Sequence, residues 1–415
     1  MINIKTLFKT VGVSFLSKAI LIISGIIFAR NLGVEQYGHY SFSLSLVYMF
    51  SVIIYAGLPN LLIREISREK DNDIIIGNII RWSKLNSIKL AFFSIILYSL
   101  FFLLGDKQGQ SVYLYVSGSL LIYLRGDLVR VCSIITAESK PFKSILFGQL
   151  SQPLILVLLF FSLFLFGEEV NVIDMMMITF LSYFITYIIA NNSVKINSDV
   201  ACLNEKSKEW RKAMLPFALM TVLGVFSNEI GIVLLGYLSN NTEVGIYKVA
   251  TQAVIVISLA LSAINTIIGP KISVLHKENK LENLQKLLRQ SVWLNMVISF
   301  PILLILFFFS DYLINIFFGF EYIESSKIIK YLCLGQFFNI SFGSVMLVLN
   351  MTNNEKTSVK WVIISLALNL LLLFIFVPSY GAIGAAISSV STMFFWNLML
   401  AVEIRKILGV KSWVH

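Results

Sequence analysis

Charged side chains occur inside apolar stretches of this sequence that are long enough to cross a lipid bilayer. The most polar stretch, 112–136, contains Arg125, Asp127 and Arg130. A charge near the centre of a membrane helix costs at least about 2.5–3.5 kcal/mol, so it usually faces a partner or a water-filled cavity rather than lipid. Such charges indicate where a membrane protein binds a charged ligand or moves an ion.

Helical spacing separates these three charges into two groups. At about 100° per residue, Asp127 and Arg130 lie on one face of a helix and can pair. Arg125 points about 160° away from Asp127 and cannot use it. Arg125 therefore needs another partner, which is either an acid on another helix or an anionic ligand.

A second acid lies in the stretch 213–237, where Asn228 and Glu229 are flanked by Gly224 and Gly231. Desolvation favours the protonated form of a buried carboxyl group, which would suit coupling to protons or sodium ions. The alternative is a static pair with a basic residue such as Arg125 or Lys248.

The cations within or near the apolar stretches outnumber the acids by three, so we expect a positive cavity and a negative ligand. Lys18 is near the middle of its stretch, although its side chain could instead reach the headgroups at the cytoplasmic end of that stretch. We predict an ion-coupling or ion-pair role for Asp127 and Glu229, and substrate binding by Lys18, Lys89, Arg125, Arg130, Asn228 and Lys248.

The sequence suggests neither catalysis nor metal binding. The three cysteines and three histidines are far apart and match no metal or disulfide spacing. We therefore expect no catalytic residue, no metal and no cofactor, apart from the coupling ion that Glu229 suggests.

The elements that position these residues are predicted to be membrane helices. The chain is 57% hydrophobic and only 13% charged, which is too apolar for the surface of a soluble protein. With about 20 residues per span, we expect an all-α integral membrane protein with twelve transmembrane helices near 11–29, 40–58, 86–104, 112–136, 145–166, 172–191, 213–237, 246–268, 291–309, 328–349, 359–377 and 382–404.

Basic residues predict the orientation of these helices. With the N-terminus inside, the cytoplasmic segments hold 24 of the 33 lysines and arginines, whereas the opposite loops hold four. The positive-inside rule thus places both termini in the cytoplasm and explains most of the net charge of +10 without nucleic acid.

An internal repeat divides the chain into halves. ARNLGVEQYGHYSFSLSL (29–46) matches GYLSNNTEVGIYKVATQA (236–253), with Gly38 opposite Gly245 and Tyr40 opposite Tyr247, an offset of 207 residues in 415. Because six spans is an even number, both halves enter the membrane in the same sense, as in parallel repeats. We predict two six-helix lobes related by pseudo-twofold symmetry, at 1–192 and 213–415, joined by a polar cytoplasmic linker at 193–212.

These features resemble the polysaccharide flippases of bacterial envelope synthesis. The flippases in question are the Wzx-type O-antigen transporters of the multidrug/oligosaccharidyl-lipid/polysaccharide exporter superfamily. The resemblance is carried by ARNLGVEQYG (29–38), LLGYLSNNTEVGIY (234–247), GFEYIESSKIIKYLCLGQFF (319–338) and VPSYGAIGAA (377–386).

The resemblance implies transport of an oligosaccharide linked to undecaprenyl pyrophosphate, from the cytoplasmic to the outer leaflet of the bacterial inner membrane. It implies alternating access by two rocking lobes. The expected partners are this lipid-linked substrate, membrane lipid and other polysaccharide-assembly proteins, such as a polymerase or a chain-length regulator, with no nucleic acid.

Three alternatives remain at this point. An exporter of cationic drugs should have an acidic cavity, contrary to the excess of cations. Peptidoglycan-precursor flippases usually add two spans after the twelfth, and here only eleven residues follow the last predicted span. A membrane polymerase or ligase is expected to carry a long catalytic outer loop, and the largest one here, about 310–327, contains Asp311, Glu321 and Glu324 but no histidine or arginine.

Overall fold

The computed structural model of this chain is built from helices throughout its described residues, which confirms the predicted all-α class. It describes residues 4–69, 72–105, 112–138, 140–165, 170–194 and 207–413. The chain forms two compact units, namely unit 1 (Met1–Leu32 and His39–Glu229) and unit 2 (Gly33–Gly38 and Ile230–His415). The boundary between them falls inside a helix, after Glu229, and residues 195–206 of the predicted linker lie outside the described residues.

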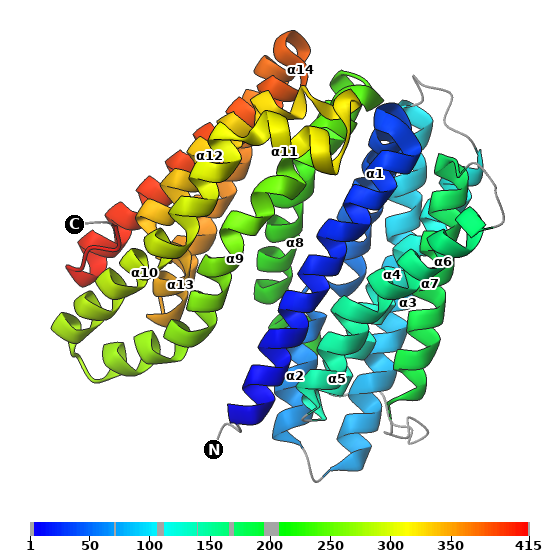
Figure 1. The fold of residues 1–415 in the computed structure, drawn as a ribbon. Helices are drawn as coiled ribbons and strands as arrows, with labels where there is room; N and C mark the ends of the chain where they lie inside the picture. Colours follow the sequence, from blue (N-terminus) through cyan, green and yellow to red (C-terminus); the bar gives the residue numbers. More distant parts are fainter. Residues whose placement is uncertain are drawn as a thin grey trace. The chain divides into compact units, whose positions relative to one another are not determined.

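Figure 1 shows the helices in their order along the chain. The first part of the chain forms α1 (Ile4–Tyr55), α2 (Leu58–Arg68), α3 (Asp73–Gly105), α4 (Val112–Ala137), α5 (Pro141–Ile145), the π-helix η1 (Leu146–Ser151), α6 (Gln152–Leu165) and α7 (Val172–Asn192). The remainder forms α8 (Ser207–Leu238), α9 (Asn241–Lys277), α10 (Leu281–Phe308), α11 (Ser310–Phe317), the 3₁₀ turn η2 (Phe320–Tyr322), α12 (Ser325–Phe342), α13 (Val345–Met351) and α14 (Glu355–Leu408).

Nine helical segments among the described residues are long and apolar enough to cross a membrane, so this is a multi-pass membrane protein. Two of them are each made of two helices joined at a kink. Gly33 (φ 72°) interrupts α1, and Gly381 (φ 54°) interrupts α14. The 26-residue α4, which contains Arg125, Asp127 and Arg130, is not among the nine.

Side chains fix several helix ends. Asn171 caps α7 by accepting hydrogen bonds from the backbone N–H groups of Ile173 (2.8 Å) and Asp174 (3.1 Å), and Asp174 returns the interaction to the Asn171 N–H (3.0 Å). At the kink in α14, the Glu243 carboxylate accepts a hydrogen bond from the N–H of Ala382 at 2.7 Å. The first turn of α9 thus caps the second half of α14.

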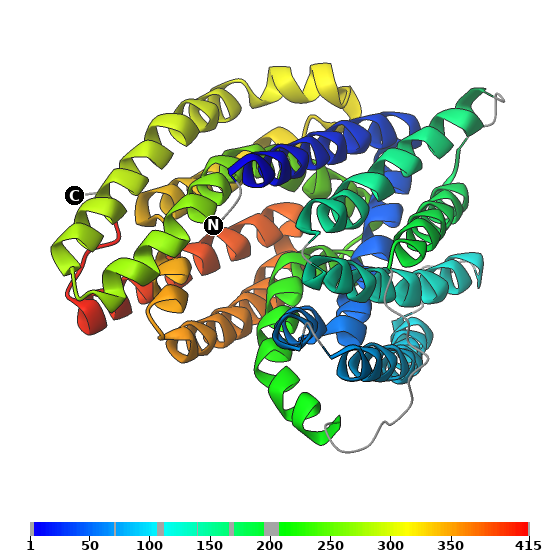
Figure 2. The same ribbon diagram turned by 90° about the horizontal axis from the view of Figure 1, so that it is seen from below.

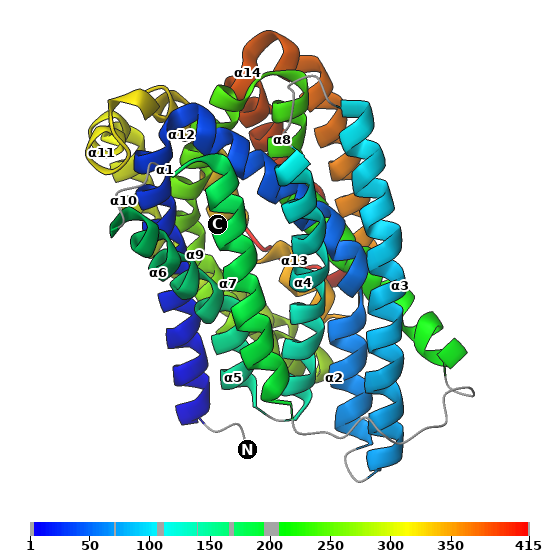
Figure 3. The same ribbon diagram turned by 90° about the vertical axis from the view of Figure 1, so that its right-hand side faces the viewer.

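In unit 1, α4 lies against α2, α3 and α7 (Figure 3). At one end of this bundle, buried residues of α2, α3, α4 and α8 form a core in which the rings of Trp82 and Trp210 lie 5.5 Å apart. The beginning of α8 is thereby anchored in unit 1, which explains why the boundary between the units falls later in this helix.

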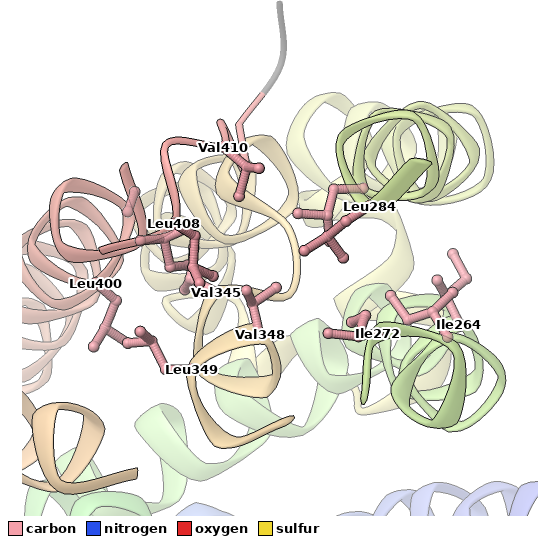
Figure 4. Packing of buried hydrophobic residues seen from close by; sticks show 13 residues of the cluster. Ile264, Ile272, Leu284, Val345, Val348, Leu349, Leu400, Leu408 and Val410 are labelled. Carbon is pink, nitrogen blue, oxygen red and sulfur yellow. The ribbon is translucent and has the colours of Figure 1, made fainter. Parts of the chain in front are cut away.

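The core of unit 2 joins α9, α10, α13, α14 and the segment after α14 (Figure 4). Gly409, in the left-handed conformation, ends α14 and redirects the chain. The following residues return to α10. The turn between α9 and α10 lies at the same end of unit 2 as the end of α14 (Figure 2). There the Gln285 amide donates to the Lys411 carbonyl (2.9 Å) and accepts from its N–H (2.6 Å).

The repeat in the sequence has a structural counterpart. In unit 1, the Tyr40 hydroxyl of α1 and the Thr179 hydroxyl of α7 are hydrogen-bonded at 2.9 Å. In unit 2, the hydroxyls of Tyr247 in α9 and Ser389 in α14 are hydrogen-bonded at 3.0 Å. The two matched tyrosines therefore make the same kind of bond, each within its own unit.

The matched glycines permit a very close approach of two backbones within unit 2. A Cβ atom at Gly38 would lie 1.7 Å from the Asn241 carbonyl oxygen and 2.8 Å from the Gly245 nitrogen. A Cβ atom at Gly245 would lie 2.2 Å from the Val34 carbonyl oxygen. Tyr37 holds the same segment, since its hydroxyl donates to the Gln252 side chain at 3.0 Å.

We expect Gly38→Ala and Gly245→Ala to lower the thermal midpoint of the purified protein strongly or to abolish folding, because the neighbouring atoms are backbone and cannot move aside. Gly224→Ala is the matched control, since a Cβ atom there meets nothing within 4 Å, and alanine is the better helix former by about 1 kcal/mol. Thermal unfolding in detergent tests this, and equal midpoints for Gly38→Ala and Gly224→Ala would show that the backbones are not in contact.

Candidate functional site

Arg125 has aromatic and hydroxyl partners rather than an acid. Its guanidinium carbon lies 3.9 Å from the centre of the Tyr48 ring and 6.0 Å from that of Tyr55, so it stacks on one ring beside another. Its Nη1 donates to the Ser51 hydroxyl at 2.5 Å and approaches the Tyr48 carbonyl at 3.5 Å. All three partners belong to the second half of α1. Helix α4 can approach α1 this closely because the residue after Arg125 is Gly126, where a Cβ atom would collide with the side chain of Ile54.

This arrangement leaves hydrogen-bonding capacity at the guanidinium. Arginine carries five N–H donors in a planar fork, and the hydrogen bonds of Arg125 to described residues use Nη1 alone. The side chain is half-buried. An aromatic ring supports the cation without neutralising it, and the remaining donors suit a bidentate contact with a phosphate group.

Asp127 and Arg130 form a buried ion pair, as helical spacing predicts. Arg130 donates from Nε to one oxygen of Asp127 at 2.5 Å and from Nη2 to the other at 2.9 Å. The Tyr187 hydroxyl of α7 adds a third hydrogen bond to Asp127 at 2.9 Å. The exposed fractions of the two charged side chains are 0% and 3%. Because Asp127 and Arg130 neutralise each other, neither offers a net charge to a ligand.

Glu229 lies within electrostatic range of Arg125. The ion pairs formed by the described residues do not include one between these two groups. One carboxylate oxygen of Glu229 is buried and has no hydrogen-bond partner among the described residues. Burial of this oxygen without a hydrogen-bond donor costs free energy, so the Glu229 carboxylate is not fully satisfied by the described residues.

The other predicted site residues are dispersed. Lys18 is half-buried in α1, Asn228 is exposed in α8, and Lys248 is half-buried in α9, within unit 2. Lys89 is exposed in α3 on the same face as the exposed side chains of Leu85 and Phe92. This apolar setting differs from that of Arg125. Among the described residues, the predicted site residues form two separate groups, namely Arg125 with Glu229 in electrostatic range and Asp127 paired with Arg130.

Sequence reasoning missed the partners of these charges. Tyr48, Ser51 and Tyr55 follow one another at spacings of three and four residues, so they share one face of α1. That spacing was a usable signal for a polar and aromatic face, although it does not say which helix the face meets. The sequence around Tyr187, the third member of the Asp127 network, contains no comparable signal that would have indicated its role.

The segment predicted to be the largest outer loop contains Asp311, which is engaged in structural contacts. Ser326 and Lys330 donate to Asp311 at 2.5 and 2.9 Å, and these hydrogen bonds hold the pKa of this carboxyl group below its ordinary value. The described residues contain no cluster of three or more histidine, cysteine or acidic side chains that could hold a metal ion. This part of the chain therefore gives no support to an enzymatic function.

We expect Asp127→Asn to destabilise the protein by about 3–5 kcal/mol, because it leaves the Arg130 charge buried and unpaired. The double variant Asp127→Asn/Arg130→Gln should recover part of this loss, since it removes the lone charge. Thermal unfolding and monodispersity in detergent measure both effects. A stable Asp127→Asn protein that fails only in transport would instead assign Asp127 a direct role.

Comparison with known proteins identifies the family to which the sequence is similar. Residues 5–276, which are 272 of the 415 residues, match the family described as polysaccharide biosynthesis protein, and residues 216–375 match the MatE family. A capsular polysaccharide biosynthesis protein, CapF of Staphylococcus aureus, is 25% identical over 49% of this chain and 50% of its own length. A probable low-salt glycan biosynthesis flippase of Haloferax volcanii is 24% identical over 40% of this chain and 35% of its own length. The chain thus spans half or less of these two relatives.

A longer match is the putative O-antigen transporter of Shigella flexneri, which is 24% identical over 87% of each chain. Among solved structures, the lipid II flippase MurJ in an inward closed conformation has a TM-score of 0.74, at 16% identity, over 95% of this chain and 86% of its own. An inward-facing multidrug resistance MATE transporter of the MOP superfamily has a TM-score of 0.76, at 14% identity, over 97% and 98%. These likenesses show a transporter fold.

The resemblance seen in the sequence is confirmed by these matches, and the family match covers well over half of the chain. This chain belongs to the polysaccharide biosynthesis protein family.

Proposed function

We propose that this protein is a flippase for a lipid-linked oligosaccharide. Its substrate is an O-antigen or capsule repeat unit on undecaprenyl pyrophosphate. The protein moves it from the cytoplasmic to the outer leaflet of the bacterial inner membrane by alternating access. The observation that carries this proposal is Arg125, a half-buried cation that is stacked on a tyrosine, has no acidic partner among the described ion pairs and retains free donors.

The chemistry of Arg125 supports a phosphate-bearing substrate. A guanidinium fork matches the oxygens of a phosphate group better than an ammonium group does. Removal from water strengthens that interaction, since the effective dielectric constant is lower. The neighbouring pair of Asp127 and Arg130 is electrically neutral. The site around Arg125 therefore favours an anion, which agrees with a pyrophosphate linkage and disagrees with a cationic drug.

The named relatives support a glycan as the cargo. Their names refer to capsular polysaccharide, low-salt glycan and O-antigen, and a carrier lipid is the common way to present such glycans to a flippase. The tyrosine hydroxyls near Arg125 are suited to contacts with sugars. A precursor flippase like MurJ is the second candidate, because that structure shares the fold over most of both chains.

We also propose twelve membrane spans with both termini in the cytoplasm. Counting α1 and α14 as two helices each and adding α4 brings the nine membrane-length helices to twelve. The excess of basic residues in alternate loops sets the orientation.

We expect Arg125→Ala to abolish translocation while leaving protein abundance near normal, because the side chain contributes a ligand contact rather than an ion pair. Arg125→Lys should retain a minor part of the activity, since it keeps the charge but loses the fork and the stacking on Tyr48. Arg81→Ala, an exposed basic residue of unit 1, is the control. Surface glycan and protein abundance are measured together, and a parallel fall of both for Arg125→Ala would make its role structural.

We propose that Glu229 couples translocation to a proton or sodium gradient. Glu229→Gln keeps the shape of the side chain and removes its charge. Translocation of labelled lipid-linked sugar in proteoliposomes should then no longer respond to an imposed gradient, although substrate binding persists. Glu209→Gln, an exposed acid at the start of the same helix, is the control and should respond fully. A stable Glu229→Gln protein with an unchanged gradient response would refute the coupling.

A further inference from the structure

A cavity of about 470 Å³ lies in unit 2 beside the last turns of α14, and it includes none of the residues discussed above as a translocation site. It is lined by Ser341, Phe342, Leu398, Ala401, Val402, Arg405 and Trp413. Its volume falls within the roughly 300–1,000 Å³ that is usual for small-molecule sites. The question is which ligand this lining would accept.

The walls of the cavity are apolar apart from one end. Leu398, Ala401 and Val402 share a face of α14 with Arg405, at spacings of three, four and seven residues. One turn before Leu398, the ring of Phe394 packs against that of Phe338 in α12 at 4.7 Å. The ring of Phe342, which does line the cavity, lies 6.4 Å from that of Phe394, and the apolar lining suits a hydrocarbon chain.

A cation lies at the other end of the cavity. Arg405 is exposed, and its side chain has no ion pair or hydrogen bond with any residue that the structure describes. Lys406 and Lys411, also exposed, lie close by in the sequence. Glu403 is two residues away and therefore points to another side of α14. The charge at this end is positive, and it is available to an anion.

The cavity is already formed in this structure. One of its walls is Trp413, which follows the segment held by the two hydrogen bonds between the Gln285 amide and the Lys411 backbone. Val410 and Ser412 on either side of Lys411 are buried, with exposed fractions of 4% and 1%. A ligand would not have to order this wall, so little entropy is lost on binding.

We propose that this cavity binds an anionic membrane phospholipid, with its phosphate on Arg405 and the first part of one acyl chain between α12 and α14. A free phosphate ion would leave the apolar walls unused. A zwitterionic headgroup would bring its own ammonium towards Arg405, Lys406 and Lys411. With the proposed cytoplasmic C-terminus, the lipid comes from the cytoplasmic leaflet. This site is separate from the proposed translocation function.

Native mass spectrometry of the delipidated full-length protein, titrated with phosphatidylglycerol or phosphatidylcholine, tests the proposal. We expect one phosphatidylglycerol to be retained. Phosphatidylcholine should bind at least about tenfold more weakly, which corresponds to about 1.4 kcal/mol, because its ammonium group is repelled by the cations at this end of the cavity. Arg405→Gln should weaken phosphatidylglycerol retention to a similar degree. Lys406→Gln, which removes an adjacent charge outside the cavity lining, should change it by less than about twofold.

A second pair of variants separates the cavity from surface charge. Val402→Phe and Leu398→Trp fill the cavity and keep every charge, so each should displace the acyl chain and reduce retention as Arg405→Gln does. Thermal unfolding identifies any variant that is misfolded, and the other member of the pair then decides. Equal retention of the two lipids, equal effects of Arg405→Gln and Lys406→Gln, or full retention by a folded cavity-filling variant would each overturn the proposal.

Discussion

The organisation of unit 1 depends on how charges are accommodated where water is absent. An isolated charge in an apolar environment is expensive, and neutralisation by a neighbour is the usual remedy. Helix α4 places three charged residues within six positions and treats them in two ways. Asp127, Arg130 and Tyr187 form a closed network with short hydrogen bonds, whereas Arg125 is supported by rings and a hydroxyl group.

The two arrangements suit different roles, a structural one for the Asp127 network and the proposed binding role for Arg125. A closed network is satisfied and has nothing to gain from a ligand, so it holds α4 and α7 together. A guanidinium on an aromatic face is stabilised by only about 0.5–2 kcal/mol, which does not compensate fully for its lost hydration. The remaining deficit is what an anionic ligand can supply. Arg125 thus departs from the rule that buried charges are paired, and such departures are expected at binding sites.

The sequence predicts local relations well and contacts between helices poorly. The pairing of Asp127 with Arg130 follows from helix geometry alone, because both lie on one element. The partner of Arg125 lies on another helix, 77 residues earlier in the chain, and no periodicity specifies which faces meet. Likewise, the repeat predicted that Gly38 and Gly245 correspond, but not that the backbones around them are in contact. The kinks at Gly33 and Gly381 join helices that hydropathy separates.

Arg125 and Arg405, which form no ion pair among the described residues, follow the same physical logic. Arg125 lies among aromatic residues inside a helix bundle, and Arg405 lies at the end of α14 beside an apolar cavity. In each place the protein supplies the apolar or aromatic surroundings and leaves the counter-charge to be provided from outside. A lipid-linked anion and a membrane phospholipid share this chemistry, since both join a phosphate to a hydrocarbon chain. In the proposed mechanism, Glu229 distinguishes the two sites, because it lies within electrostatic range of Arg125. A charged Glu229 would oppose an anion there, whereas a Glu229 neutralised by a proton or a cation would permit one. Under this proposal, the affinity of the site at Arg125 for its ligand depends on the ion bound at Glu229, and this reciprocal dependence is the requirement for coupling transport to a gradient.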